Sequence, residues 1–541
     1  MAITEHIFLY LNHISTEMLL IGILTSLFWW YSNKKLSYWK DKNIPYVKPL
    51  PFFGSVIDYL TTPMHVLELK RYFSLGPVYG FFEGHRPVLV VGDPKLIRDI
   101  FIKDFPIFRN RRIFQCDDIM NLSLLVNEGD YWRRIRSIVS PTFTTKKLKR
   151  ILGIFKDCSK VLVQNFKTSA QKKEPTSVLR FFNAFMLDVI ASSAFSTKID
   201  SLNDPKNEFV QQYNKNFGIM HKSKLCLMLL FTSWKHLKNI FKTSAVNESA
   251  QQFFIDFIKE IISERKRTKQ TRDDFLQLLL DIEKKSTIGN KKESVENEDD
   301  INANDGEDIS GQNIYPDVSQ KNLTHEELVS QCVTFLLAAH DTTTSMLSTV
   351  IYMLAINESI QEKAYQEVAE HLQETNGELT YEALQKMKYL DNIMSEALRL
   401  YPPVMRTSRR AEKTYIHGET GIIIQKDVVI LLPILAIHRD PKYYPDPEKF
   451  DPERFSDEEV AKRDPHVYLP FGHGPRNCVG LRFAQLSAKV CLVYIISCFI
   501  FKSCSQTKIP LELSKDAYFV LHAKDVTVKL EIRNDCPLVY T

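Results

Sequence analysis

The nine cysteines of this 541-residue sequence form no Cys-x-x-Cys pair and follow no regular spacing. That absence argues against a disulfide framework, a zinc ribbon and a cysteine-ligated iron–sulfur cluster. It is consistent with a chain that works in a reducing, cytosol-facing compartment. The net charge of only +5 gives no indication of nucleic-acid binding, which usually needs a concentrated basic stripe. The sequence also lacks Gly-x-Gly-x-x-Gly, so no flavin or nicotinamide site is evident.

The sequence lacks an uninterrupted apolar run of the roughly 20 residues that cross a bilayer comfortably. The nearest approach is the uncharged run MLLIGILTSLFWWY at residues 18–31, which residues 7–14 could extend. The lysines that follow it predict that its C-terminal side stays in the cytosol. Because no small-residue cleavage site follows, a retained signal anchor over residues 1–33 is favoured over a cleaved signal peptide, and a buried N-terminal helix is the alternative. Lysines, prolines and a glycine then indicate a basic, Pro-rich hinge at residues 34–54.

The remaining residues, 55–541, predict one large domain. PVYGFFEG and RPVLVVGDP read as two strands joined at Gly84–His85. Long helical periods fill residues 128–285, and short strands are expected within residues 405–435. Residues 285–321 are rich in polar residues and hold almost no large apolar side chain, so they are predicted to form a disordered loop.

After that loop, Thr324 and Glu327 have the spacing of a capping box. About thirty residues of largely apolar helix follow them. A helix that is apolar on every face is expected to run through the middle of the protein.

The stretch PFGHGPRNCVG, residues 470–480, sets one cysteine among glycines and an arginine, directly before an apolar helix predicted to end near Phe499. Gly472 and Gly474 allow a tight or left-handed backbone. Cys478 is expected at the helix N-terminus, where the helix dipole, free N–H groups and the nearby Arg476 favour a thiolate. A thiolate suits axial ligation of a haem iron. On local chemistry alone, a nucleophile and a buried structural cysteine remain open.

The same stretch fits the pattern Phe-x-x-Gly-x-Arg-x-Cys-x-Gly, and in this the chain resembles the cytochrome P-450 superfamily of haem-thiolate monooxygenases. The resemblance covers essentially the whole chain after the anchor. It implies a mainly α fold with small β-sheets (α+β), in which a triangular helical prism surrounds a buried haem b. Cys478 would be the ligand of the iron. The defining positions are Phe471, Gly474, Arg476, Cys478 and Gly480.

The resemblance also implies which other residues hold the haem. Trp132 and Arg136 lie four positions apart in GDYWRRIR, and so on one helical face, and are expected to bind a propionate. Planar guanidinium groups suit such carboxylates. Arg111, Arg406 and Arg476 match further positions that face the propionates. Taken alone, each arginine would be read as a solvated surface charge.

Glu396 and Arg399 in SEALRLYPPVMR are three residues apart and share a helical face. An ordinary surface salt bridge would explain them. The resemblance implies instead a buried cluster completed by Arg454 from DPERF, with a structural rather than a chemical role.

Polar residues interrupt the central apolar helix at AAHDTTTS, residues 338–345. Buried polar groups need partners, and a threonine that bonds back to the preceding turn is one explanation. The resemblance implies an acid–alcohol pair, Asp341 and Thr342, that delivers protons for oxygen activation. Ala339 stands where glycine is usual, and His340 is interpreted as a spectator.

The resemblance therefore implies a monooxygenase that inserts one oxygen atom from O2 into lipophilic substrates such as xenobiotics, steroids or fatty acids. Electrons would come from NADPH through a reductase. WRRIRSIVSPTFTTKKLKRI resembles the animal microsomal clan that metabolises drugs and toxins, which favours broad detoxification at the endoplasmic reticulum membrane, with the catalytic domain facing the cytosol. Two alternatives stay open: a haem-thiolate isomerase or dehydratase acting on a peroxide, and a haem-thiolate binding protein without turnover.

The expected partners are NADPH–cytochrome reductase, cytochrome b5, membrane lipid, O2 and a small lipophilic substrate, with no nucleic acid. Residues 114–125 and 225–231 are candidate pocket segments, and the second could also dip into the membrane. A basic region could dock an acidic reductase or be an ordinary solvated face. It comprises Arg133, Arg134, Lys146, Lys147 and Lys149.

Overall fold

The computed structural model describes residues 2–112, 118–216, 222–231, 247–287 and 322–539. Its chain divides into two compact units. The smaller unit consists of Met1–Val91, His221–Thr243 and Arg410–Leu431, and the larger unit of Gly92–Met220, Ser244–Arg409 and Leu432–Thr541. The predicted anchor and hinge therefore share a unit with the first strands. The domain boundaries predicted at residues 33 and 54 stay predictions.

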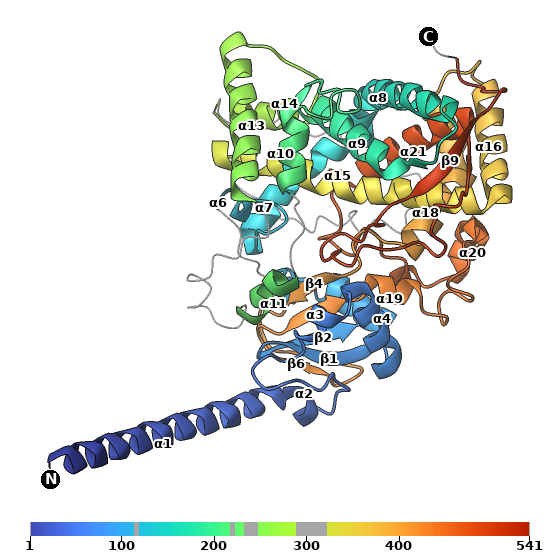
Figure 1. Ribbon diagram of the computed structural model, residues 1–541. Helices are drawn as coiled ribbons and strands as arrows, with labels where there is room; N and C mark the ends of the chain where they lie inside the picture. Colours follow the sequence, from blue (N-terminus) through green and yellow to red (C-terminus); the bar gives the residue numbers. More distant parts are fainter. Residues whose placement is uncertain (1, 113–117, 217–221, 232–246, 288–321, 540–541) are drawn as a thin grey trace. The chain divides into compact units, whose positions relative to one another are not determined.

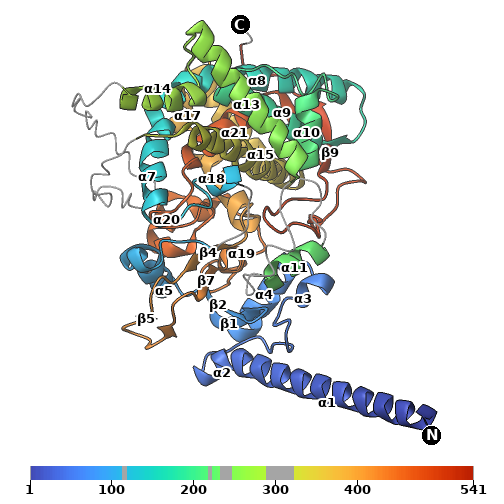
Figure 2. The ribbon, with the colours of Figure 1, turned by 90° about the vertical axis from the view of Figure 1, so that its left-hand side faces the viewer.

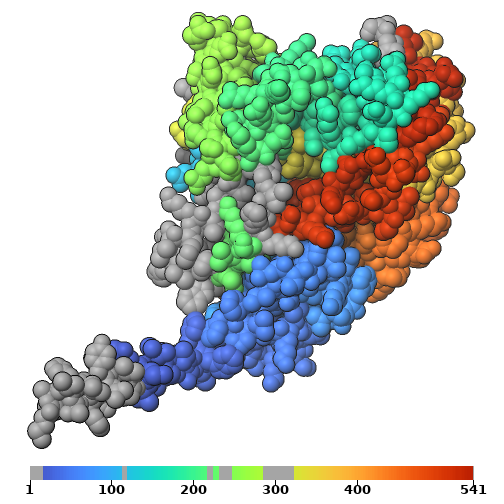
Figure 3. Space-filling model, viewed as in Figure 1, coloured from blue at the N-terminus to red at the C-terminus, as the bar shows by residue number. Residues whose placement is uncertain are grey.

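The smaller unit begins with one continuous helix, α1 (Ala2–Leu36) (Figure 1). Residues 18–31 of α1 lie at the surface of the unit (Figure 3). Their large apolar side chains are exposed, Met18 by 69% and Trp30 by 61%. A contiguous apolar surface of this kind is unusual on a protein that meets only water.

A small sheet forms the core of the smaller unit. Strands β1 (Val78–Glu83) and β2 (Arg86–Val91) pair antiparallel, with Glu83 opposite Arg86, so the chain turns at Gly84–His85 as predicted. β2 then pairs parallel with β7 (Val429–Leu432), and these strands bury most of their side chains. The other elements of the unit are α2 (Tyr38–Asp41), α3 (Asp58–Thr61), α4 (Met64–Leu75), α11 (Lys222–Phe231), β5 (Tyr415–Ile416) and β6 (Ile423–Ile424).

The larger unit is built around helix α15 (His325–Ile356), a 32-residue helix that is buried over most of its length. Thr324 and Glu327 form the predicted capping box: the Thr324 hydroxyl accepts from the Glu327 N–H at 3.2 Å, and the Glu327 carboxylate accepts from the Thr324 N–H at 2.9 Å. The helix packs against α9 (Val178–Phe195), α13 (Glu248–Thr268), α18 (Lys388–Leu400) and α21 (Leu481–Cys498), as Figures 1 and 2 show.

The predicted disordered loop begins inside a helix. Residues 285–287 continue α14 (Phe275–Thr287), and residues 288–321 lie outside the described residues. The remaining helices of the larger unit are α5 (Pro94–Arg98), α6 (Asp118–Asn121), α7 (Gly129–Val139), α8 (Thr145–Gln171), α10 (Glu208–Asn216), α16 (Glu358–Gln373), α17 (Tyr381–Lys386), α19 (Ile434–His438) and α20 (Asp457–Lys462).

The strands of the larger unit are few and short among the residues that the structure describes. β3 (Thr176–Ser177), β9 (Thr527–Ile532) and β8 (Phe499–Lys502) form one antiparallel sheet in that order, and β4 (Thr407–Arg410) leads along the chain into the smaller unit. Short π or 3-10 turns span Asp99–Lys103, Phe105–Ile107, Ser140–Phe143, Pro452–Phe455 and Pro465–Val467. The prediction of a mainly helical chain with small sheets is therefore confirmed.

Within the described residues, α9 and α21 are long and apolar enough to cross a bilayer. Most of each segment, 61% of α9 and 78% of α21, is buried inside the protein. Side chains already covered by protein have no apolar surface to offer to lipid, so both are core helices of the larger unit.

Candidate functional site

The loop before α21 folds tightly enough to require its glycines. Gly472 and Gly474 both have left-handed backbones, with φ of 75° and 73°. At Gly474 a Cβ atom would also lie 2.0 Å from the carbonyl oxygen of Phe101. The Cys478 N–H closes the loop by donating to the Phe471 carbonyl at 2.9 Å. The sequence therefore fixes the backbone that presents Cys478.

Cys478 precedes α21 by three residues, because the helix begins at Leu481 rather than at the cysteine. Its thiol keeps accessible surface, although protein atoms surround it closely enough to desolvate it. Burial raises the pKa of Cys478, against the opposing effects of the Gly480 N–H and of Arg136 and Arg111. The predicted low-pKa thiolate is thus wrong for the protein alone. A metal cation at the sulfur would reverse this, since a coordinating thiol loses its proton outright.

Arginines from two other segments converge on this loop, which carries a third arginine, Arg476. Arg136 on α7 donates to the Asn477 carbonyl at 2.9 Å and to its side-chain oxygen at 2.8 Å. Arg111 donates to the Arg476 carbonyl at 3.2 Å. The Arg476 guanidinium donates to the Arg109 carbonyl at 2.6 Å and lies 4.8 Å from the ring centre of the buried Trp132.

These buried cations repel one another. Burial, together with Arg111 and Arg409, lowers the pKa of Arg476 to about 8, with Glu128 acting in the opposite direction. Burial and Arg136 lower the pKa of Arg111 to about 10, and burial with Arg111 lowers the pKa of Arg409 well below its ordinary value. The Nε atoms of Arg111, Arg409 and Arg476 are buried without a hydrogen-bond partner among the described residues. Charges buried in this way need an anionic partner.

A dicarboxylate beside Cys478 would satisfy this cluster, and the two propionates of haem b supply one. The described residues therefore fit the group that the motif implies: a sulfur for the iron and a ring of guanidinium groups for the carboxylates. Arg111, Trp132, Arg136 and Arg476 are all brought to this place. Phe471 and Gly480 lie half-buried in the same loop.

Arg409 is a member of the cluster that the sequence analysis missed. Arg406, which it selected, is half-buried, whereas Arg409 is only 1% exposed and interacts with Arg111. Arg409 also donates to the His473 carbonyl at 3.4 Å in the cysteine loop. Alternation along the short β4 strand, where Arg409 is the buried position, is the signal that could have identified it.

We expect Arg409→Gln to weaken haem retention more than Arg406→Gln does. Losing one charge-assisted hydrogen bond to a carboxylate costs about 1.5–3 kcal/mol, or roughly ten- to hundredfold in affinity. The rate of haem transfer from each purified variant to an excess of apomyoglobin measures the effect. Faster transfer from Arg406→Gln than from Arg409→Gln would instead return the propionate role to Arg406.

The polar residues of α15 lie in a partly accessible turn of an otherwise buried helix. Ala338 is exposed, while Ala339, Asp341 and Thr342 are half-buried. The Thr342 hydroxyl donates to the Ala338 carbonyl at 2.8 Å, which is the bond to the preceding turn that was one of the expected explanations. Asp341 and Thr342 are neighbours in the chain, but the Asp341 carboxylate makes its hydrogen bonds with residues other than Thr342.

Asp341 is held by two other side chains. Its Oδ1 atom lies 2.8 Å from His340 Nδ1 and accepts a hydrogen bond from the Tyr213 hydroxyl at 3.1 Å. His340 therefore contacts the predicted acid, and its interpretation as a spectator stays a prediction. Tyr213, 128 residues away on α10, could not be found by local spacing.

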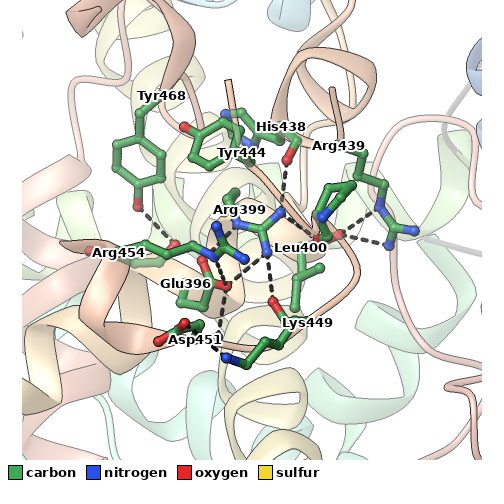
Figure 4. A network of polar contacts seen from close by, with 12 residues as sticks. Glu396, Arg399, Leu400, His438, Arg439, Tyr444, Lys449, Asp451, Arg454 and Tyr468 are labelled. Atoms are coloured by element: carbon green, nitrogen blue, oxygen red, sulfur yellow. Dashed lines mark hydrogen bonds and ion pairs between the residues drawn. The ribbon is translucent and has the colours of Figure 1, made fainter. Parts of the chain in front are cut away.

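The predicted glutamate–arginine cluster is assembled in the structure (Figure 4). Glu396 and Arg399 are fully buried and form two hydrogen bonds of 2.7 Å, and Arg454 Nε lies 3.5 Å from Glu396 Oε1. Arg399 also donates to the His438 carbonyl at 2.8 Å. The His438 ring in turn accepts from the Leu469 N–H at 2.8 Å, directly before the cysteine loop. The cluster thus supports the segment that presents Cys478.

The predicted pocket segments are only partly described. Residues 114–117 lie outside the described residues, while α6 packs against α15. Residues 225–231 lie in α11 of the smaller unit, where Leu225, Met228 and Leu229 are buried and the helix packs against α3. Leu227 is 41% exposed.

The basic region is less uniform than the sequence indicated. Arg134 forms an ion pair with the buried Glu327, and Lys149 forms one with Glu382 at 3.2 Å. Arg133 lies 3.7 Å from Asp130. Lys146 is exposed and Lys147 is half-buried.

Comparison with known proteins identifies the family to which this chain belongs. The family model for cytochrome P450 matches residues 44–530, so the chain belongs to the cytochrome P450 family and is a haem b-dependent monooxygenase. Cytochrome P450 3A25 of Mus musculus is 34% identical over 510 residues, which cover 94% of each chain. Cytochrome P450 3A27 of Oncorhynchus mykiss is 35% identical over 533 residues, covering 98% of this chain and 97% of that one. Cytochrome P450 3A9 of Rattus norvegicus is 35% identical over 507 residues, covering 92% and 93%.

Proposed function

We propose that this chain is a membrane-bound monooxygenase that inserts one oxygen atom into lipophilic substrates with electrons passed from NADPH by a reductase. Oxidation of xenobiotics is the favoured role, with steroids and fatty acids as further substrate classes. The observation that carries the proposal is the set of buried arginines gathered around Cys478, because it fits a haem whose iron the sulfur binds.

Each group in the proposed site has a task that its own chemistry allows. When bound, haem supplies the activation of O2. Cys478 would hold the iron, and Arg111, Arg136, Arg409 and Arg476 would hold the propionates. On α15, Asp341 would move a proton and Thr342 would orient the water that carries it.

Turnover in 18O2 tests this function. The full-length protein, reconstituted with a microsomal NADPH reductase, is offered a panel of three substrates that are hydroxylated at carbon: a steroid, a fatty acid and coumarin. We expect NADPH-dependent products that each contain one 18O atom. Products formed from a lipid hydroperoxide without NADPH or reductase would favour the isomerase or dehydratase instead. Haem-loaded protein that consumes no NADPH across the panel would favour a binding protein.

The location and further partners are part of the same proposal. The exposed apolar side chains of α1 support anchoring in the endoplasmic reticulum membrane, with lipid around α1 and the catalytic residues in the cytosol. The lysines at the start of α8 support docking of an acidic reductase, and cytochrome b5 is proposed as a second electron donor.

A further inference from the structure

His340 makes two polar contacts that a neutral imidazole cannot satisfy together. The side chain is only 2% exposed. Nδ1 lies 2.8 Å from Asp341 Oδ1, and Nε2 lies 2.9 Å from the main-chain carbonyl oxygen of Asn183 on α9. A carbonyl oxygen only accepts, and so does an ionised carboxylate. A neutral ring has one N–H, so one of the two contacts would lack a hydrogen unless the ring carries both protons.

Tyr213 on α10 supports the same arrangement from another side. Its hydroxyl donates to Asp341 Oδ1 at 3.1 Å, and its ring centre lies 4.2 Å from that of His340. Burial and the neighbouring Asp341 raise the pKa of Tyr213 well above its ordinary value, so the phenol remains a donor. An aromatic ring at this distance also stabilises a cationic imidazole by the attraction of its face for positive charge.

The carboxylate is the ionised partner of the pair. Burial by itself would raise the pKa of Asp341, but hydrogen bonding and charge from His340, the Tyr213 hydroxyl and, more weakly, the charge of His522 lower it below its ordinary value. The contacts from both His340 and Tyr213 fall on Oδ1. Oδ2 takes part in neither of them.

We infer that His340 is a positioning residue: as an imidazolium held by Asn183 and Tyr213, it fixes the Asp341 carboxylate through Oδ1 and leaves Oδ2 to relay protons. The inference rests on the proposed role of Asp341 and Thr342 in proton delivery. Three helices together fix the position of the Asp341 carboxylate. α9 supplies the Asn183 carbonyl, α10 supplies the Tyr213 phenol, and α15 carries the ion pair itself. A carboxylate without this support could turn away, and electrons would leave the site as peroxide instead of product.

The first experiment measures how electrons are divided in the full-length holoenzyme with reductase, using testosterone as the probe substrate. His340→Phe keeps an aromatic ring beside Tyr213 but removes both polar contacts. We expect about a tenfold lower yield of product per NADPH, since misplaced proton donors lose this much or more, with a matching rise in hydrogen peroxide. Tyr213→Phe removes one hydrogen bond and should show the same change to a smaller degree. Tyr352→Phe is the matched control: Tyr352 is a buried phenol on α15, the helix that carries His340. This variant should leave the yield unchanged.

Thr342→Ala is made in parallel, so that two kinds of failure can be told apart. If Thr342→Ala diverts electrons to peroxide while His340→Phe does not, the positioning role of His340 is refuted. If neither variant does so, the proposed proton delivery by Asp341 and Thr342 fails, and the histidine is then judged by its protonation state alone.

The second experiment reads that protonation state without turnover. NMR of the full-length haem-bound protein with 15N-labelled histidine rings should show one doubly protonated ring whose signals disappear in His340→Phe. This reading needs only the wild type and Tyr213→Phe if His340→Phe does not fold, because loss of the phenol should shift the same signals. A neutral tautomer at His340 would overturn the inference.

Discussion

Replacing Cys478 by alanine is expected to abolish the strongly red-shifted Soret band of the reduced protein in carbon monoxide, and all NADPH-driven oxidation with it. The shifted band requires a thiolate on the iron, and electron donation from that sulfur favours cleavage of the O–O bond. No other described cysteine lies in a loop lined with buried arginines. The measurement is a difference spectrum of the membrane-expressed variant, reduced, with and without carbon monoxide.

Cys491→Ala provides the control for this substitution. Cys491 is fully buried on α21, the helix that follows the Cys478 loop. Burial and the neighbouring Cys158 hold the pKa of Cys491 well above its ordinary value, so it remains a thiol. This variant should keep both the band and turnover. Retention of the shifted band in Cys478→Ala would refute the assignment of the ligand.

Replacing Glu396 by alanine is expected to lower the free energy of unfolding by about 3–5 kcal/mol, the usual effect of breaking a buried ion pair. Glu396 is fully buried, and its removal leaves two guanidinium groups, those of Arg399 and Arg454, without their carboxylate. Glu396 Oε1 also accepts a hydrogen bond from the Asp451 N–H at 2.9 Å, so the substitution leaves this main-chain donor without its acceptor as well. Urea unfolding followed by circular dichroism measures the change through the midpoint and slope.

A glutamate in an exposed ion pair, Glu382 with Lys149, is the comparison for Glu396. Glu382 lies 3.2 Å from Lys149, and both side chains are largely exposed. Glu382→Ala should change stability by less than about 1 kcal/mol. Equal effects of the two substitutions would show that the Glu396 cluster is not a structural support.

Local patterns predicted the elements that local chemistry determines. The turn at Gly84–His85, the capping box at Thr324 and the length of α15 were all evident from residues only a few positions apart. The cysteine loop was evident for the same reason, because the left-handed backbone that its sequence allows is found at Gly472 and Gly474. The turn, the capping box and the loop are each decided within one turn or one helix end.

What the sequence could not show depends on distant residues and on burial. The contact between Tyr213 and Asp341 joins positions 128 residues apart, so no local residue spacing could predict it. The choice between Arg406 and Arg409 depends on burial: Arg409, on β4, is 1% exposed, whereas Arg406, just before the strand, is half-buried. The pKa of Cys478 had the wrong predicted direction because the helix end and the nearby charges were visible in the sequence, whereas desolvation by the folded chain was not.

Arg399 is bound on one side by a carboxylate and on the other by main-chain carbonyls, those of His438, Pro447 and Lys449. A main-chain carbonyl is present whatever side chain the residue carries. As homologous chains diverge, positions 447 and 449 are therefore free to drift without removing a hydrogen bond from the arginine. Glu396 and Arg399 can change only together. The backbone of the segment that contacts this arginine should therefore keep its path in homologues even where its amino-acid sequence has changed.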